Sequence, residues 1–389
     1  MVNLKDLFVS FLKIGATAYG GPAMVAGIRN AAVDEKKWIS EREFFEGVAL
    51  SQIIPGATAF QASSYVGFKL RGIKGAMTAA FAFTLPAFLL MLGFSAVYFL
   101  FGEINIFQAA FKGMRVIVVS IIINAVINIG RSAISNWKGI LLSLLAFWMF
   151  SYKVNILLVI LIAAVIGIFF YHSSEQTGEE KQLISEKGNE RRNKFLLSLS
   201  IISGFILVLI FFWFIKYISP DTSKLSFVLM KITAVAFGGA YSILPLFQAE
   251  VVDKYGWLST KEFIDGVAMG QITPGPILIT ATFIGYKVYG IAGAVLATIA
   301  MFTPSFAILM FLSLQYENFK KFRFFQPMIK GILASFVGML GLMVFYFGRE
   351  AIVDLKTLMM SIAAAVLIYF NVKLYYIIPA GILISVVLF

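Results

Sequence analysis

Long apolar segments alternate with short polar ones along nearly the whole chain. The apolar segments contain glycine, proline and aromatic residues throughout and lack the alternation of period two that marks membrane strands. The pattern predicts an all-α, polytopic membrane protein of about 13 hydrophobic segments. These segments fall at about 7–28, 44–68, 75–100, 107–130, 139–151, 154–171, 195–218, 225–247, 262–286, 291–315, 325–347, 357–370 and 374–389.

Composition supports the same class of protein. Of the 389 residues, 60% are hydrophobic and 13% are charged, and the mean hydropathy is +0.89. The formal charge of +12 arises from basic residues in short loops, where they orient a membrane protein, so nucleic acid is not an expected partner. The chain has no cysteine, and its one histidine, His172, lies in a polar loop. No catalytic residue, metal site or cofactor is therefore predicted.

A polar break interrupts two of the apolar segments at matching places. Residues 47–57 read GVALSQIIPGA and residues 266–276 read GVAMGQITPGP. Proline has no N–H and glycine leaves the backbone uncovered, so a membrane helix breaks there, against protein or water rather than lipid. Paired breaks of this kind indicate the binding site of a transporter. The expected substrate-binding residues are Gln52, Pro55, Gly56, Gln271, Thr273, Pro274 and Gly275.

The expected ligand is an anion. A helix that starts after a break presents free N–H groups carrying about half a positive charge. Two such helix starts that converge near the membrane midplane would suit an oxyanion, and the amides of Gln52 and Gln271 would add further donors. The alternative is that each Pro-Gly pair only kinks a packed helix. The duplication and the neighbouring glutamines favour a binding site.

A second, weaker break lies in the first helix of each group of segments. Its glycine pairs serve either close helix packing or approach of a ligand to the backbone. Lys13 and Lys231 precede these pairs inside apolar runs. An intramembrane lysine is costly, so each of the two either binds substrate or extends its side chain to the interface. The glycine pairs are Gly20-Gly21 and Gly238-Gly239.

No carboxylate lies deep in any predicted span. The nearest ones, which are candidates for coupling proton movement to transport, stand three residues apart before each Pro-Gly break. The competing interpretation is helix capping, because Ser40 with Glu43 and Ser259 with Glu262 form capping boxes. Proton coupling therefore stays open at this point. The four carboxylates are Glu43, Glu46, Glu262 and Asp265.

The second group of segments repeats the first with an offset of 218 or 219 residues. Trp38 matches Trp257, Pro86 matches Pro304, and the Gln-Ile-x-Pro-Gly core matches in full. Matches of so many rare residues in one register indicate a duplication. The chain is expected to divide into a first transporter repeat at 1–171, a polar linker plus connecting helix at 172–224, and a second repeat at 225–389.

The relative orientation of the repeats depends on the broken segment. If that segment crosses the membrane, the connecting helix inverts the second repeat; if it is re-entrant, the two repeats are parallel. Loop charge favours inversion, with the N-terminus inside and the C-terminus outside, because basic loops in one repeat match loops with few bases in the other. One basic cluster fits this topology badly, namely Arg29, Lys36, Lys37 and Arg42.

These motifs resemble those of the chromate ion transporter family in its long-chain, two-domain form. The first-half signature is similar in Gly20-Gly21-Pro22, Gln52-x-x-Pro55-Gly56 and Phe83-Thr84-Leu85-Pro86. The second-half signature is similar in Gly270-Gln271-Ile-Thr273-Pro274-Gly275-Pro276 and Pro304-Ser305-Phe306. One departure is Ala57, where the family pattern has a second proline.

The resemblance implies a secondary transporter of chromate, with sulfate as the related anion, in the bacterial inner membrane, acting by efflux that confers chromate resistance. Its implied partners are the oxyanion and the lipid bilayer, and assembly into a homo-oligomer is left open. An enzyme is not expected, because the spans offer no histidine, cysteine or buried carboxylate pair. The alternatives are a transporter or channel for another anion and a non-transporting membrane scaffold.

Overall fold

The protein is built from α-helices, and no strand occurs in the described ranges, which confirms the predicted fold class. The structure, a computed structural model, describes residues 2–19, 21–102, 104–134, 136–171, 188–238, 240–319, 325–370 and 372–389. Most of the predicted polar linker lies outside these ranges. The α-helices are α1 (Leu4–Thr17), α2 (Gly21–Arg29), α3 (Glu41–Ile53), α4 (Thr58–Phe101), α5 (Asn105–Ala133), α6 (Trp137–Ser151), α7 (Ile156–Tyr171), α8 (Gly188–Ile215), α9 (Pro220–Val235), α10 (Ile243–Phe247), α11 (Thr260–Ile272), α12 (Thr280–Phe319), α13 (Phe325–Ala351), α14 (Leu355–Tyr369) and α15 (Leu374–Leu388). Short π-helical and 3-10 segments are η1 (Asn30–Glu35), η2 (Ala240–Ser242), η3 (Gln248–Lys254) and η4 (Ile277–Ile279).

Several of these helices are suited to span a membrane. Within the described residues, α4, α5, α8, α12 and α13 contain stretches long and apolar enough to cross, and α6, α7, α14 and α15 are shorter apolar helices. Their outer faces carry large exposed apolar side chains, such as Phe169 at 77%, Leu207 at 65% and Val387 at 85% exposure. Such a surface is suited to lipid rather than water, so the chain is an integral membrane protein.

Each Pro-Gly break is the tip of a helical hairpin. Gly47 in α3 lies so close to Tyr65 in α4 that a Cβ at Gly47 would overlap the tyrosine ring. In one continuous helix these two residues would stand about 27 Å apart, so the chain must double back between them. Gly266 in α11 and Phe283 in α12 repeat the same contact. The broken segment is therefore re-entrant in both repeats.

The first helix of each repeat also doubles back. A Cβ on Gly27 in α2 would lie 3.6 Å from the side chain of Ile14 in α1, although the break at residues 18–20 separates the two helices. In the second repeat, the ammonium of Lys231 on α9 lies 2.5 Å from the carboxylate of Glu250 on η3, beyond the equivalent break. Neither segment crosses the membrane as one helix.

A sharp bend divides α4 and α12 into two helices each. The bends lie at Arg71-Gly72 and Tyr289-Gly290, where the glycines have φ values of 60° and 54°. Beyond the first bend the chain folds back so closely that a Cβ on Gly67 would strike the backbone carbonyl of Gly75. The second parts of α4 and α12 are the long apolar helices that can cross the membrane.

These turns change how many membrane crossings each repeat can have. In the first repeat both hairpins double back and α6 packs against α7, so α4, α5 and α8 remain as the helices long and apolar enough for single crossings. Three such crossings would turn the second repeat upside down. The inverted arrangement that loop charge favours therefore stays a prediction, and it does not require the broken segments to cross the membrane, because α1 and α2 also double back. In the inverted arrangement the basic residues Arg29, Lys36 and Arg42 would share a side with loop 69–74, as the charge rule requires.

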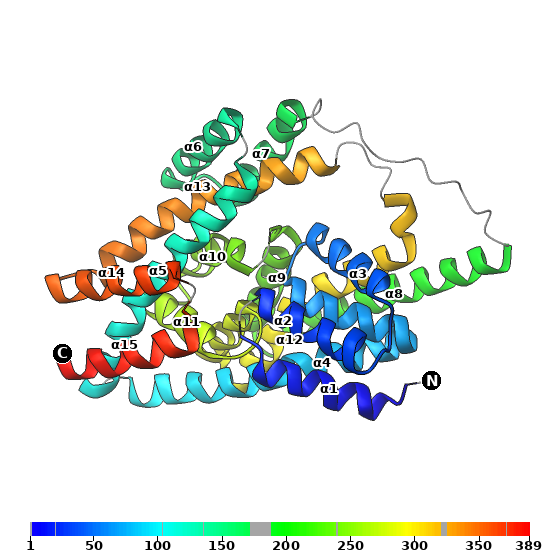
Figure 1. The fold of residues 1–389 in the computed structure, drawn as a ribbon, viewed down its shortest axis with the longest axis horizontal. Coiled ribbons are helices and arrows are strands. Elements are labelled where there is room, and N and C mark those ends of the chain that lie inside the picture. Colours follow the sequence, from blue (N-terminus) through cyan, green and yellow to red (C-terminus); the bar gives the residue numbers. More distant parts are fainter. Residues whose placement is uncertain are drawn as a thin grey trace.

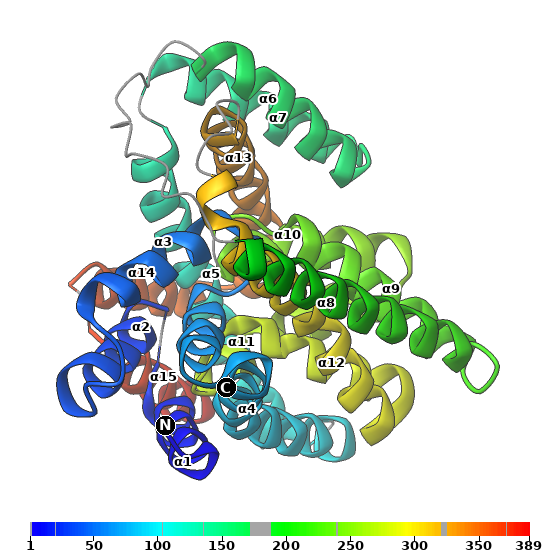
Figure 2. The same cartoon turned by 90° about the vertical axis from the view of Figure 1, so that its right-hand side faces the viewer.

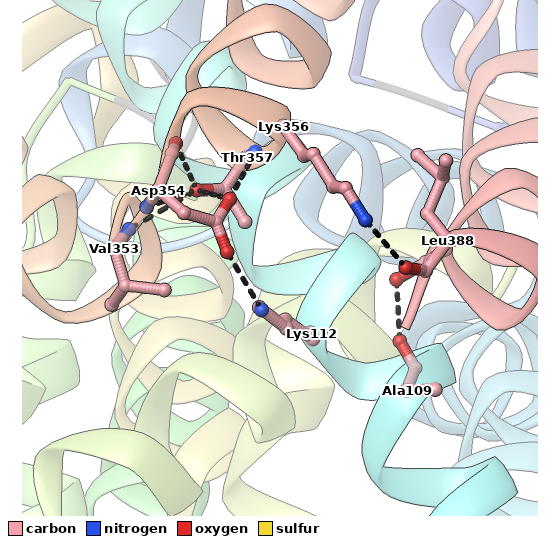
Figure 3. A network of polar contacts seen from close by, with 8 residues as sticks. Ala109, Lys112, Val353, Asp354, Lys356, Thr357 and Leu388 are labelled. Carbon is pink, nitrogen blue, oxygen red and sulfur yellow. Dashed lines mark hydrogen bonds and ion pairs between the residues drawn. The ribbon is translucent and has the colours of Figure 1, made fainter.

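The two repeats exchange their last two helices. α14 and α15 of the second repeat pack on α5 of the first, while α6 and α7 of the first pack on α13 of the second (Figure 1, Figure 2). Polar contacts fasten the first of these junctions (Figure 3). Lys112 on α5 lies 3.1 Å from the Asp354 carboxylate at the start of α14, and the hydroxyl of Ser385 on α15 donates to the carbonyl oxygen of Ala109. Each repeat therefore completes the core of the other.

Candidate functional site

The breaks of the two repeats are joined by reciprocal hydrogen bonds. The N–H of Gly56, at the tip after α3, donates to the carbonyl oxygen of Ala236 in the break after α9, at 2.9 Å. The N–H of Gly275, at the tip after α11, donates to the carbonyl oxygen of Ala18 in the break after α1, at 3.3 Å. Each bond runs from one repeat to the other, as across a two-fold axis. All four breaks therefore meet between the repeats.

The tips require glycine. Gly56 and Gly275 have φ values of 120° and 108°, which side chains other than glycine rarely allow. A Cβ on Gly56 would also overlap the Ser305 side chain, and a Cβ on Gly275 would lie 2.9 Å from the Cβ of Ala87. The N–H groups of both glycines are used within the protein, which corrects the expectation that these two amides are uncovered.

A large cavity lies where the breaks meet. Its volume is about 1650 Å³, and both repeats line it. Gln52 comes from the last turn of α3 and Gln271 from the last turn of α11, so the cavity brings together the two glutamines that stand 219 positions apart in the sequence. Other polar side chains on its wall include Lys13, Thr17, Tyr19, Thr58, Asn124 and Tyr241.

Two helix starts face this cavity without a side-chain cap. Ala57 precedes α4 and Pro276 precedes η4, and neither side chain caps its helix. Ala57, Thr58 and Ala59 line the cavity from the first repeat, and Pro276 and Ile277 line it from the second. The first N–H groups of a helix have no acceptor within the helix, so these turns can donate to a ligand.

The glutamine and threonine side chains differ in which hydrogen-bond donors remain available to a ligand. The Gln271 Oε1 atom accepts a hydrogen bond from the Tyr241 hydroxyl at 3.5 Å, which leaves the Nε2 group as a donor. Gln52 is exposed to the cavity. Thr273 also lines the cavity, but its hydroxyl donates to the carbonyl oxygen of Gly270 at 3.0 Å. The two amides are therefore the more available side-chain donors.

Basic residues outnumber acidic ones on the cavity wall. Lys13, Arg29, Lys36 and Lys373 line it, against Glu35 as the one carboxylate among the described residues there. Arg29 is already paired with Asp34 at 2.9 Å and with Glu41 at 2.6 Å. A concave wall with this excess of positive charge attracts anions and disfavours cations.

The remaining predicted binding residues lie elsewhere. Pro55, Gly56 and Pro274 are buried in the hairpin tips, outside the cavity wall. Gly238, with a φ of 88°, belongs to the break after α9. Gly21 is the first residue of α2, while Gly20 and Gly239 fall outside the described residues. Lys231 does not reach the cavity, because Glu250 holds its ammonium.

Three of the four candidate coupling carboxylates serve local structure. Glu43 and Glu262 close the predicted capping boxes, since each accepts a hydrogen bond from the N–H of its capping serine, at 3.0 and 2.8 Å. Glu262 also pairs with Lys287 at 2.8 Å. Glu46 pairs with Arg42 on its own helix at 3.2 Å.

Asp265 differs from the other three, because it is fully buried. The Nε atom of Arg115 on α5 lies 2.6 Å from its carboxylate, and the hydroxyl of Tyr98 on α4 donates to it at 2.9 Å. Asp265 is thus enclosed by protein, although it stands near the start of its predicted span 262–286. Sequence analysis missed Arg115, although a lone arginine within the apolar run 107–130 is a signal in itself.

Glu250 is a second buried carboxylate that sequence analysis missed. Its side chain is 3% exposed and is held by the ammonium groups of Lys231, at 2.5 Å, and Lys254, at 3.2 Å. It stands just beyond the predicted segment 225–247, at the end of an apolar run. The available signal was a difference between the repeats, because the first repeat has no carboxylate at the matching position.

Comparison with known proteins gives consistent results across the chain. The profile described as chromate transporter matches residues 5–168 and 223–386. An uncharacterized transporter of Methanocaldococcus jannaschii is 38% identical over 364 residues, which is 94% of this chain and 89% of the relative. A probable chromate transport protein of Synechococcus elongatus is 30% identical over 374 residues (94% and 89%). A chromate transport protein of Cupriavidus metallidurans is 29% identical over 368 residues (94% and 88%). No solved structure matches.

Proposed function

Since the chain belongs to the chromate transporter family, we propose that it is a secondary transporter that moves chromate, with sulfate as the related anion, out of the cell across the inner membrane. The observation that carries this proposal is the shared cavity. Gln52 and Gln271 reach it from different repeats, and uncapped helix starts from both repeats face it. In inverted-repeat transporters such a junction is where substrate binds.

The donors around the cavity match the chemistry of a tetrahedral dianion. Each of its four oxygens can accept hydrogen bonds from N–H groups, and the two glutamine amides and the helix starts supply them from opposite sides. Lys13 adds a positive charge on the wall. Hydrogen bonds to a charged group are the stronger ones. Chromate and sulfate share the same shape and charge, so these donors favour both anions over chloride.

The charge of the loops supports the direction of transport that we propose. Val2, near the N-terminus, accepts a hydrogen bond from Arg71 at 3.2 Å, so the N-terminus lies with the basic loop 69–74. By the charge rule this side is cytoplasmic. Lys36 lines the cavity, and we place the opening of the cavity on this cytoplasmic side, where an efflux transporter takes up its substrate.

Proton coupling, if the flux depends on a pH gradient, is best assigned to Asp265. It is the buried member of the four candidate carboxylates and lies on α11, two turns from Gln271. A change in its charge would loosen the contacts to Arg115 and Tyr98 that fix α11 against α5 and α4. Movement of α11 would in turn displace the Gln271 amide.

Uptake into proteoliposomes tests the proposed function. Radiolabelled sulfate flux should saturate with concentration, and unlabelled chromate should compete with it. A panel of oxyanions measured at two pH gradients would give the selectivity and the coupling together. Flux that rises linearly with concentration and that no oxyanion inhibits would indicate a channel or a leak, and would contradict the proposal.

A further inference from the structure

Glu250 occupies the position in the second repeat that Ala31 occupies in the first. Each lies in a π-helix that is followed by a residue with positive φ directly before a tryptophan, Lys37 at 51° and Gly256 at 61°. The carbonyl oxygens of Ala31 and Glu250 each accept a hydrogen bond from the N–H five residues ahead, at 3.0 and 3.1 Å. The two backbones therefore match residue for residue at this point.

These equivalent positions face different cavities. Ala31 lines the large cavity together with Lys13 and Val372. Glu250 lines a cavity of about 290 Å³ together with Lys254 and Val154. The valines are themselves equivalent, since each donates its N–H to the carbonyl oxygen five residues earlier, at 3.0 Å for Val372 and 3.1 Å for Val154. The small cavity is thus the counterpart of the part of the large cavity that Ala31 and Val372 line. We call the region around Ala31 and Val372 the first mouth and the region around Glu250 and Val154 the second mouth.

The two mouths differ in how their lysine side chains are paired with carboxylates. In the first repeat, Lys13 lines the large cavity, and residue 31 is an alanine, which has no carboxylate to pair with the Lys13 ammonium. In the second repeat, the matching Lys231 is bound to Glu250, which is also bound to Lys254. The carboxylate is 3% exposed, whereas the two lysine side chains are 33% and 49% exposed.

We propose that the small cavity is a second oxyanion vestibule, and that Glu250 keeps it closed by occupying Lys231 and Lys254 in place of the substrate. The carboxylate and the oxyanion are both acceptors for ammonium groups, so they compete for the same two lysines. This inference rests on the proposed function, because it assigns the second vestibule to the same anion. When Glu250 moves away from the two lysines, the second mouth opens. Lys231 then attracts the anion there, as Lys13 does in the first mouth.

Because the chain contains no cysteine, single introduced cysteines can test directly whether Glu250 keeps the second vestibule closed. Val372→Cys reports on the first mouth and Val154→Cys on the second, and a membrane-impermeant maleimide measures the access of water to each. In the otherwise unchanged protein, the cysteine at position 372 should react quickly and the one at 154 slowly. Adding Glu250→Ala leaves Lys231 and Lys254 without their shared carboxylate, so labelling at 154 should accelerate by at least about tenfold, while labelling at 372 slows.

A reciprocal variant and a control complete the test. Ala31→Glu supplies the first mouth with the missing carboxylate and should slow labelling at 372. Glu350→Ala removes an exposed glutamate at the end of α13 and should change neither rate. If the Glu250→Ala protein still transports chromate but labelling at 154 is unchanged, Glu250 does not keep the second vestibule closed. The proposed function is then unaffected. Faster labelling at 154 in a protein that shows no oxyanion flux would support closure by Glu250 and contradict the proposed function.

Discussion

The N–H of Gly56 donates a hydrogen bond of 2.9 Å to the carbonyl oxygen of Ala236, and this bond ties the tip of a hairpin in one repeat to the break in the other. Gly275 and Ala18 form the matching bond at 3.3 Å. The two Pro-Gly tips therefore serve first to hold the repeats together. The donors for a ligand come from the residues on either side of each tip, which these bonds hold in place.

Replacement of a tip glycine should impair both stability and transport. Gly275→Ala forces a side chain into positive φ, at a cost of roughly 1–2 kcal/mol, and adds a close contact with Ala87. We expect a lower thermal unfolding midpoint in detergent and reduced chromate flux. Gly93→Ala is the control, because this helical glycine has open space around it and should gain or lose less than about 1 kcal/mol. Equal behaviour of the two variants would show that the tip geometry is not required.

The buried pair of Arg115 and Asp265 should behave as a unit. Arg115→Met leaves a buried carboxylate without its partner, so we expect a loss on the order of 3–5 kcal/mol and a sharply lower unfolding midpoint. Asp265→Leu alone should be similarly harmful. The double variant should recover much of the stability, because no unpaired charge remains. A double variant that is less stable than both single variants would argue against a simple ion pair.

Lys13 should contribute long-range attraction of the anion rather than its orientation. Lys13→Gln removes a charge from the cavity wall, and the loss of roughly 1 kcal/mol should raise the KM for chromate about fivefold. The effect should shrink at high ionic strength, because salt screens exposed charges. Lys5→Gln, on the same helix but outside the cavity wall, is the control. A KM that does not depend on salt in either protein would exclude this role.

Acid should weaken the junction between α5 and α14. The pKa of Asp354 is lowered to about 2, because the backbone N–H of Thr357 donates to its carboxylate and the Lys112 ammonium lies nearby. A depressed pKa in the folded state adds stability above the ordinary value and loses it as the pH falls. The unfolding midpoints of the parent protein and Asp354→Asn should therefore differ at pH 6 and converge between about pH 4 and pH 2. A difference that persists unchanged at about pH 2 would contradict the assignment.

The sequence was sufficient to predict the helical class, the duplication and both Pro-Gly breaks, because each depends on local rules. Proline, glycine and apolar runs act through their own backbone. The same local patterns do not tell whether a broken helix continues or doubles back. That depends on which side chains face each other afterwards, as Gly47 and Tyr65 do here. For this reason the sequence alone left both the parallel and the inverted arrangement of the repeats open.

The pairing of charged residues that are far apart in the chain could not be predicted from the sequence either. Arg115 and Asp265 stand 150 positions apart in different repeats, and each alone looks like an isolated charge near an apolar segment. Glu250 and Lys231 are closer in sequence, but their contact requires the chain to reverse between them. The candidate site itself was predicted more closely, since Gln52, Gln271 and Gly275 do line one cavity. The use of the tip amides in protein contacts could not be predicted, because their acceptors belong to the other repeat.

Equilibrium binding of radiolabelled chromate to the purified protein tests most directly whether both repeats build one anion site. The parent protein should bind one chromate per chain. Gln52→Ala and Gln271→Ala should each weaken binding at that single site by about tenfold or more, because each removes a donor to a charged ligand. Two sites per chain, each sensitive to only one of the glutamines, or binding that neither substitution changes, would contradict a shared site.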